Sequence, residues 1–295
     1  MITTLPMALS ITGATKHYAS GFTLNDITFD LPSGYIMGLI GPNGAGKTTL
    51  IKLILNMIRR DAGTITVLGM DAIEDEESVK EQIGVVFDTS YFIDTWTVGK
   101  VENVMRPMYR TWDAKAFDGY LQRFGLDRRK KIKELSRGMQ MKLMLAVALS
   151  HDARLLILDE PTSGLDVLAR DELMDILAEV IEDGEHSIIF STHITADLER
   201  VADFITYITR GALYYTGPKD EFEDSFRIIK GGLDLLDCVP ADAIVGEHRY
   251  STGFDALVRS ENLALFPFDD VVIEPASIDD IIRLTNVGQM NTEGE

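Results

Sequence analysis

The central stretch of this sequence reads Gly41-Pro42-Asn43-Gly44-Ala45-Gly46-Lys47-Thr48-Thr49. It follows the apolar run 35–40 and precedes the apolar segment 50–55, so the order predicts a strand, a glycine-rich turn and a helix. In that setting the glycines let successive backbone N–H groups point into one concavity, with the positive N-terminus of the helix behind them. The stretch therefore predicts a phosphate-binding loop (P-loop) and a site for a nucleoside triphosphate.

The side chains of the P-loop have the chemistry that phosphates and a metal ion require. Lys47 can reach the β- and γ-phosphates, and the hydroxyl of Thr48 can bind Mg²⁺. The other residues of the loop are Gly41, Pro42, Asn43, Gly44, Ala45, Gly46 and Thr49. A glycine-rich turn without a ligand has no need of all these residues in this order, so we expect the loop to bind its nucleotide with Mg²⁺.

Two carboxylates follow a second predicted strand. The apolar residues 155–158 lead to Asp159 and Glu160, just before a turn at Pro161. Beside a P-loop, a carboxylate at the end of a buried strand can hold Mg²⁺ directly or through water, and Asp159 has this position. Glu160 points differently and can accept a proton from the attacking water. An acidic strand end is common in isolation, so this expectation depends on the P-loop nearby.

A histidine follows the third predicted strand, residues 187–191. A lone histidine is more often structural or solvated than catalytic. His193, however, leaves a strand that is predicted to lie near the P-loop, where a neutral imidazole could contact the γ-phosphate and orient the water. We therefore expect Lys47, Glu160 and His193 to be the catalytic residues.

The composition excludes several classes of protein. The chain has 295 residues, 45% hydrophobic and 25% charged, which is typical of globular proteins and allows one large domain or two ordinary ones. A net charge of −19 and a pI of about 4.6 predict a surface that repels nucleic acid, so we expect no nucleic-acid partner. The single cysteine, Cys238, allows no internal disulfide and fits a reducing compartment. Without a signal peptide or an apolar run near ~18–20 residues, a membrane role would come through a partner.

The strand and helix patterns predict an α/β fold. Residues 9–31 alternate apolar and polar positions and predict antiparallel strands at a sheet edge, and residues 62–69 and 83–87 predict further strands. From about residue 97 to 149 the pattern is helical, as it is again over 166–181.

Local signals mark the ends of the predicted elements. Asp113 or Asp118 can cap a helix in the helical region, and Gly125 can end it. The character of the sequence changes after Gly217, where we expect a domain boundary. Residues 1–217 would then form the nucleotide-binding domain, with a helical subdomain at about 97–150, and residues 218–295 a small α+β C-terminal accessory region.

Further motifs, in order along residues 9–217, resemble those of the ATP-binding cassette (ABC) family, the ATPase subunits of ABC transporters. The segment Leu135-Ser136-Arg137-Gly138-Met139-Gln140 resembles the family signature LSGGQ, which distinguishes this family from other P-loop proteins. Ser163-Gly164-Leu165-Asp166 resembles the D-loop, Thr192-His193 matches the switch histidine, and Tyr18 lies where the family stacks an aromatic ring on adenine. The resemblance implies ATP as the nucleotide.

The resemblance also implies a P-loop NTPase fold of ABC type, with a mixed sheet, an antiparallel edge subdomain and a helical subdomain that carries the signature. Two chains would bind head to tail around two ATP molecules, as a homodimer or as a heterodimer with a second ATPase subunit. Ser136 and Gly138 would open a helix and contact the ATP of the opposite chain. Arg137, Met139, Gln140 and Asp166 would lie at the same interface.

Three residues depart from the family pattern. In the signature, Arg137 replaces a glycine and Met139 replaces a glutamine. After the strand that ends at Phe87, the family usually has a glutamine that binds Mg²⁺ and senses the membrane partner, and here the residue is Asp88. A shorter carboxylate can still bind Mg²⁺ through water, so we expect Asp88 to join Thr48 and Asp159 in the metal site.

These features predict an ATP-hydrolysing subunit that powers transport by an ABC transporter. The chain would lie in the cytoplasm, peripheral on the cytoplasmic face of the membrane, bound to integral membrane subunits. Residues 274–281 resemble a closing segment of exporter-type ATPases, which favours export over import. The alternative is a regulatory ABC-type ATPase, outside transport, that acts on a soluble partner through residues 218–295.

Overall fold

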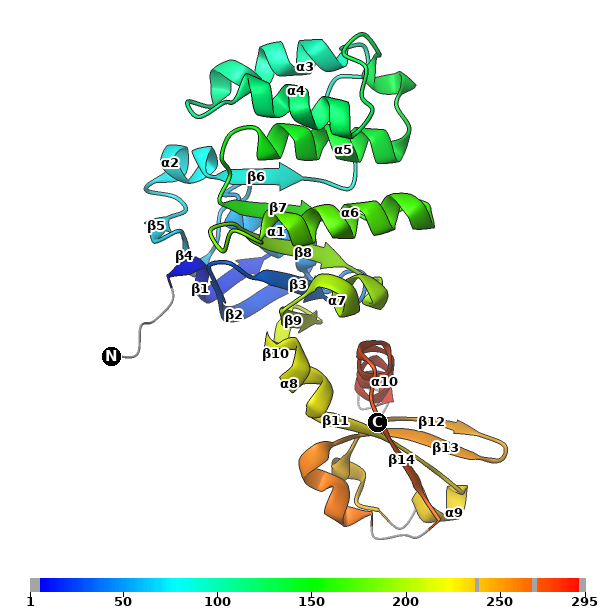
Figure 1. Cartoon of the computed structure of the whole chain (residues 1–295). Helices are drawn as coiled ribbons and strands as arrows, with labels where there is room; N and C mark the ends of the chain where they lie inside the picture. Colours follow the sequence, from blue (N-terminus) through cyan, green and yellow to red (C-terminus); the bar gives the residue numbers. More distant parts are fainter. Residues whose placement is uncertain (1–5, 237–238, 267–269, 292–295) are drawn as a thin grey trace. The chain divides into compact units, whose positions relative to one another are not determined.

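The computed structural model of the chain describes residues 6–236, 239–266 and 270–291 (Figure 1). Cys238, on which the disulfide expectation rests, lies outside these ranges. The chain divides into two compact units, Met1–Thr216 and Gly217–Glu295. None of the helices within the described ranges has both the length and the apolar character that crossing a bilayer requires.

The first sheet is antiparallel and contains the strands predicted from residues 9–31 and 62–69. In the order β2-β1-β4-β5, its members are β2 (Thr23–Pro32), β1 (Met7–His17), β4 (Ala62–Val67) and β5 (Met70–Asp71). These strands are the predicted antiparallel edge subdomain, and the structure shows that they form a sheet separate from the one that carries the P-loop. Because β1 pairs with β2 on one side and β4 on the other, its backbone groups are used within a sheet of its own.

The second sheet carries the predicted site. In the order β10-β9-β3-β8-β7-β6, its strands are β10 (Ala212–Pro218), β9 (Phe204–Thr209), β3 (Ile36–Ile40), β8 (Ser187–Thr192), β7 (Leu155–Asp159) and β6 (Ile83–Val86). Strands β9, β3, β8, β7 and β6 run parallel. The fully buried apolar runs of β3, β7 and β8 fit a parallel sheet that is covered on both faces.

The parallel register places the site residues at one edge of this sheet. Ile40, the last residue of β3, is paired with Thr192, and Asp159, the last residue of β7, is paired with Ser191. The P-loop, the acidic pair and the histidine therefore all leave the sheet at its C-terminal edge, which is where open α/β sheets bind their ligands.

One hydrophobic core joins the two sheets and the P-loop helix, α1 (Lys47–Ile54). The cluster includes Leu9 and Ile11 of β1, Met37 and Leu39 of β3, Leu155 and Ile157 of β7, and Leu50, Ile51, Leu53 and Ile54 of α1. Side-chain packing thus holds the antiparallel sheet to the parallel one, together with a backbone hydrogen bond from the N–H of Asn25 in β2 to the carbonyl of Gly211 at 2.7 Å. The α/β fold class predicted from the sequence is confirmed.

The region from 97 to 149 is helical, as predicted. Its α-helices are α3 (Val98–Met105), α4 (Ala114–Arg123) and α5 (Arg137–Leu149), and α5 packs by β6 (Figure 1). Elsewhere in the unit are α2 (Glu76–Glu81), α6 (Val167–Val180) and α7 (Thr195–Val201). Asp113 caps α4, whereas Asp118 lies within that helix, and Gly125 follows its end with φ of +65°.

The second unit is an α+β fold with a small core of its own. Its antiparallel sheet, in the order β12-β13-β11-β14, consists of β12 (Ile244–Tyr250), β13 (Gly253–Arg259), β11 (Phe226–Gly231) and β14 (Val272–Pro275). Its helices are α8 (Lys219–Asp224), α9 (Leu233–Leu236) and α10 (Ile278–Asn291). Ser277 lies just before α10, and its Oγ accepts the N–H of Asp280 at 3.1 Å in the first turn of that helix.

The capping of α4 yields a stability prediction. Asp113 Oδ1 accepts the N–H groups of Lys115 at 2.7 Å and Ala116 at 3.1 Å. Asp113→Ala leaves both donors without this acceptor, and we expect it to lower the free energy of unfolding by about 1 kcal/mol. Urea unfolding followed by circular dichroism measures the change. Lys115→Ala, an exposed change on the same helix, is the control, and equal stability of the two variants would contradict the cap.

Candidate functional site

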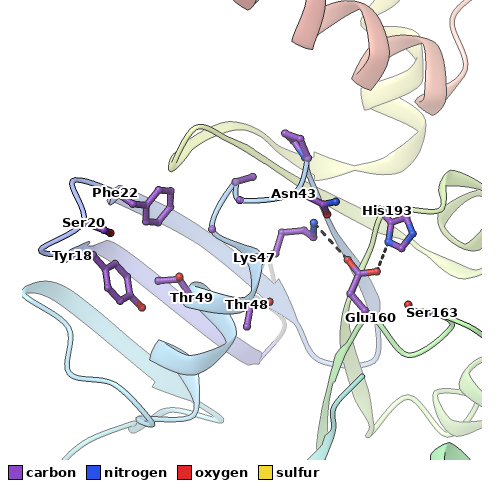
Figure 2. Close-up of a pocket in the computed structure, with 14 residues that line it drawn as sticks. Tyr18, Ser20, Phe22, Asn43, Lys47, Thr48, Thr49, Glu160, Ser163 and His193 are labelled. Atoms are coloured by element: carbon purple, nitrogen blue, oxygen red, sulfur yellow. Dashed lines mark hydrogen bonds and ion pairs between the residues drawn. The ribbon is translucent and has the colours of Figure 1, made fainter. Parts of the chain in front are cut away.

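A pocket of about 670 Å³ lies over the P-loop (Figure 2). Three groups of residues line it: the first turn of the chain after β1, the P-loop, and the loops that follow β7 and β8. They are Tyr18, Ser20, Phe22, Pro42, Asn43, Gly44, Ala45, Gly46, Lys47, Thr48, Thr49, Glu160, Ser163 and His193. The structure thus brings the P-loop, both proposed hydrolytic residues and the proposed adenine-stacking ring to one cavity.

The backbone of the P-loop needs glycine at its two ends. Gly41 has φ of +151°, and a Cβ there would lie 2.0 Å from the carbonyl oxygen of Ile208. Gly46 has φ of +116°, and a Cβ there would lie 2.7 Å from Leu24 Cδ1. Gly46 is also the N-cap of α1 and supplies no side-chain cap. The first N–H groups of α1 are therefore available to an anion.

Lys47, Glu160 and His193 point toward one another (Figure 2). Lys47, only 6% exposed, donates from Nζ to the carbonyl of Gly41 at 2.8 Å, and the same amine lies 3.6 Å from Glu160 Oε1. His193 Nδ1 lies 2.5 Å from Glu160 Oε2. The carboxylate of Glu160 therefore lies between a cation that can bind phosphate and an imidazole that can share a proton. A carboxylate at this place in the pocket is suited to accept a proton from a water beside a bound phosphate.

Glu160 adopts a strained backbone conformation that Ser191 supports. Its φ of +51° lies in the left-handed region, which costs a non-glycine residue about 1–2 kcal/mol. Its N–H donates to Ser191 Oγ at 2.9 Å and to the carbonyl of Ser191 at 3.2 Å. The strain turns Glu160 away from the line of β7 and toward the pocket, as expected where surrounding structure enforces a functional geometry.

Ser191 also orders the proposed metal site. Asp159, which is 6% exposed, accepts from Ser191 Oγ at 2.6 Å and from Thr48 Oγ1 at 3.3 Å, both at Oδ1. No motif marks Ser191, and its only signal in the sequence is a hydroxyl that follows an apolar run in a buried strand. A single strand-end serine therefore fixes both Asp159 and Glu160.

The donors at this place fit Mg²⁺. The ion prefers hard oxygen ligands and usually keeps waters, with one or two carboxylates and the substrate phosphates. Thr48 and Asp159 supply a hydroxyl and a carboxylate beside the P-loop. Among the described residues no group of three or more His, Cys, Asp or Glu side chains could hold a metal, so nucleotide phosphates and water would complete the coordination.

The structure does not place Asp88 in this group. Asp88 is exposed, its Oδ1 accepts from Thr89 Oγ1 at 2.8 Å, and it is absent from the described residues that line the pocket. The loop after β6 carries it at the edge strand of the sheet, one strand beyond β7. Sequence order shows that Asp88 follows a strand, but not which way its loop turns.

Tyr18 is held at the pocket by a tight turn. Its N–H donates to the carbonyl of Phe22 at 2.9 Å, and the two rings lie 6.2 Å apart. Asp61 anchors the strand end before the turn, because it accepts the backbone N–H of His17 at 2.6 Å and the amine of Lys16 at 3.0 Å. These hydrogen bonds lower the pKa of Asp61 to about 2, and the bond from the His17 backbone has the largest effect. Phe22 adds a second aromatic ring that no motif predicts.

The signature segment lies apart from this pocket. Ser136 caps α5, its Oγ accepting the N–H of Met139 at 3.3 Å, so it opens a helix as predicted. Arg137 donates to the carbonyl of Asp88 at 3.2 Å and packs on Gly164, where a Cβ would lie 2.8 Å from its Nη1. The five signature residues Ser136, Arg137, Gly138, Met139 and Gln140 are not among the described residues that line the pocket. Asp166 likewise caps a helix, α6.

Comparison with known proteins agrees with this geometry. A family model described as "ABC transporter" matches residues 24–163. An uncharacterized ABC transporter ATP-binding protein of Methanocaldococcus jannaschii is 32% identical over 260 residues, covering 82% of this chain and 95% of that protein. The Nod factor export ATP-binding protein I of Rhizobium leguminosarum bv. viciae is 34% identical over 211 residues, which is 70% of this chain and 68% of that protein.

Solved structures agree as well. A structure of the ATP-binding subunit of an ABC transporter is 28% identical, has a TM-score of 0.67, and covers 73% of this chain and 92% of that one. The motifs, the pocket over the P-loop and these comparisons all lead to one assignment. The chain belongs to the ABC transporter family, as an ATP-binding subunit with the fold and the residues of an ATPase.

Proposed function

We propose that this chain hydrolyses ATP to power transport across a membrane, through a complex whose pore is formed by integral membrane subunits. The observation that carries the proposal is the contact of Glu160 with both Lys47 and His193 inside the P-loop pocket. We further propose export as the direction. The relative named for Nod factor export supports it, as does the resemblance of residues 274–281 to exporter-type ATPases.

The residues of the pocket divide the reaction among them. The P-loop N–H groups and the Lys47 amine would hold the β- and γ-phosphates of a bound nucleotide. Thr48 and Asp159 would hold Mg²⁺, which when bound would supply positive charge against the phosphates. Water attacks the γ-phosphorus while the bond to the β–γ bridging oxygen breaks. Glu160 accepts the proton of the water, and His193 orients the water and the γ-phosphate. The products are ADP and phosphate.

We propose that the site is completed by a second chain. The signature residues on α5 and Asp166 on α6 begin two helices and lie outside the described lining of their own pocket. Facing the nucleotide of another copy, or of a second ATPase subunit, the N-terminus of α5 would present N–H groups to a phosphate. Loss of the γ-phosphate on hydrolysis would then let the two chains separate.

An apolar groove supports docking of a membrane subunit. It has a volume of about 210 Å³, lies beside the edge strand β6, and is lined by Leu55, Met57, Lys80, Ile83, Val85, Phe87 and Tyr109. Met57, one of the residues that line the groove, is 55% exposed. Phe87 leads directly to Asp88, so a partner helix in the groove would lie next to the loop that Arg137 contacts. We propose that this complex sits on the cytoplasmic face of the membrane.

We also propose a domain boundary at Gly217, with residues 1–217 as the nucleotide-binding domain and 218–295 as an accessory region. The separate cores of the two units support it. The rival function, regulation of a soluble partner, would act through this accessory region. In that case a soluble partner would bind to its exposed apolar residues, such as Val272, which is 55% exposed.

Two substitutions test the roles in hydrolysis. Lys47→Ala removes a charge-assisted contact to phosphate worth about 2 kcal/mol, so we expect ATP affinity to fall about 30-fold. Glu160→Gln removes the base but keeps the shape, so we expect ATP binding to persist and turnover to fall by roughly 100-fold or more. Fluorescent-nucleotide titration and phosphate release measure the two effects. Glu182→Gln, an exposed change after α6, is the control, and normal turnover in Glu160→Gln would exclude that residue as the base.

Two substitutions of equal exposure separate transport from the rival. Tagged chain is purified from detergent-solubilised membranes of its host, and co-purifying proteins are identified. We expect a multi-spanning membrane protein with the wild type and with Val272→Glu, but not with Met57→Glu, because removing a carboxylate from water in this mostly apolar groove costs several kcal/mol. If only soluble proteins co-purify, and Val272→Glu loses them, the transport proposal fails and the rival replaces it.

A further inference from the structure

A buried carboxylate lies behind the hydrolytic pair. Asp197, on α7, is 2% exposed. Its Oδ2 accepts the hydroxyl of Thr162 at 2.6 Å and the hydroxyl of Thr192 at 3.3 Å. Both threonines are fully buried. A carboxylate removed from water in this way is stable only where hydrogen bonds and opposite charge compensate for its lost hydration. Loss of either hydroxyl contact would therefore destabilise this part of the structure.

The two threonines belong to the loops that carry the hydrolytic pair. Thr162 lies two residues after Glu160, in the loop that follows β7, and Thr192 immediately precedes His193 at the end of β8. Thr192 Oγ1 also accepts the N–H of Ile194 at 3.0 Å, which fixes the backbone on the far side of the histidine. One carboxylate oxygen thus connects the backbone beside the base to the backbone beside the histidine.

The other oxygen of Asp197 faces helix α6. Arg170 Nε lies 3.9 Å from Asp197 Oδ1, beyond hydrogen-bond distance. This Nε is buried, and within the described part of the chain it has no hydrogen-bond partner. Buried donors are nearly always paired, so an unpaired Nε at this distance marks a contact between opposite charges and not a hydrogen bond. Arg170 lies one turn after Asp166, so the carboxylate also connects the site to the helix that carries the proposed dimer contact.

We propose that Asp197 is a positioning residue of the hydrolytic site, which holds Thr162 and Thr192 and so fixes Glu160 and His193 relative to each other. The inference rests on the proposed hydrolysis at Glu160. Asp197 does not line the pocket, so it acts through the two threonines and touches neither nucleotide nor water. Its effect falls on turnover and not on affinity, because the P-loop holds the phosphates independently.

The Thr162 hydroxyl offers the sharpest test, since Asp197→Ala removes a buried charge that Arg170 faces and so tests folding as much as catalysis. Thr162→Val removes the hydroxyl and keeps the shape, whereas Thr162→Ser keeps the hydroxyl. Because small misplacements of catalytic groups can cost up to about 100-fold, we expect Thr162→Val to lower kcat about 10-fold or more and Thr162→Ser to restore it. The affinity for fluorescent ATP should stay within about 2-fold, as expected for a loss confined to the transition state.

A matched control removes a buried hydroxyl elsewhere. Thr206 of β9 is fully buried, and its hydroxyl donates to Met37 Sδ at 3.2 Å. Thr206→Val should lose stability but keep kcat. If Thr162→Val fails to fold, Asp197→Asn replaces it under the same criteria. In one orientation of the asparagine amide its NH₂ group faces Arg170. In the other orientation the NH₂ group replaces the oxygen that accepts the hydroxyls of Thr162 and Thr192.

The outcomes distinguish this inference from the function on which it rests. A wild-type chain that does not hydrolyse Mg-ATP overturns the proposed function, and this inference with it. An active wild type whose Thr162→Val variant keeps kcat per folded molecule, counted by nucleotide titration, overturns the inference alone. An equal fall of kcat in Thr162→Val and Thr206→Val also overturns it, because the effect would then be one of general stability.

Discussion

The parallel pairing of β3, β8 and β7 is the constraint on which the site depends. With Ile40 opposite Thr192 and Asp159 opposite Ser191, three loops from distant parts of the sequence leave the sheet side by side. A shift of one residue in either pairing would turn the buried side chains to the opposite faces of the sheet and move the acidic pair away from the P-loop. The apolar strand sequences that fill the core therefore also determine where the P-loop, the acidic pair and the histidine lie relative to one another.

The buried polar groups behind the pocket are hydrogen-bonded to one another and support the loops that line it. Ser191 holds Asp159 and the strained backbone of Glu160, while Asp197 holds the threonines that adjoin Glu160 and His193. Buried charges of this kind are costly unless their partners are in place, so each loop stabilises the conformation of the next. Residues that line the pocket, such as Glu160 and His193, are thus supported by Ser191 and Asp197, which are not among its described lining residues, and such support favours precise placement.

The sequence was sufficient to predict the P-loop, the helix behind it, the buried strands and the Lys47–Glu160–His193 cluster. These features depend on local order: a glycine-rich turn needs left-handed backbone, and a fully buried strand needs an unbroken apolar run. Strand pairing is not local, so the sequence predicted the antiparallel strands but not that they form a sheet of their own. The path of a loop is not local either, so Asp88 was expected at the metal and lies outside the described pocket.

The buried polar support was not predictable from the sequence for a related reason. Asp197 lies in a short helix of ordinary composition, and nothing in its neighbourhood shows that Thr162 and Thr192 converge on it. Similarly, the sequence shows that Arg137 replaces a signature glycine, but not that its guanidinium donates to the carbonyl of Asp88. Such contacts follow from the meeting of three loops and become visible only in three dimensions.

An experimental structure of the Glu160→Gln chain with Mg-ATP would test the central claim most directly, since it shows the substrate in the pocket before hydrolysis. We predict that the Lys47 amine contacts the β- and γ-phosphates, that Mg²⁺ is bound by Thr48 with Asp159 directly or through water, and that adenine stacks on Tyr18. We also expect Ser136 of a second chain at the γ-phosphate. ATP bound away from the P-loop, or Mg²⁺ held without Thr48 and Asp159, would contradict the claim.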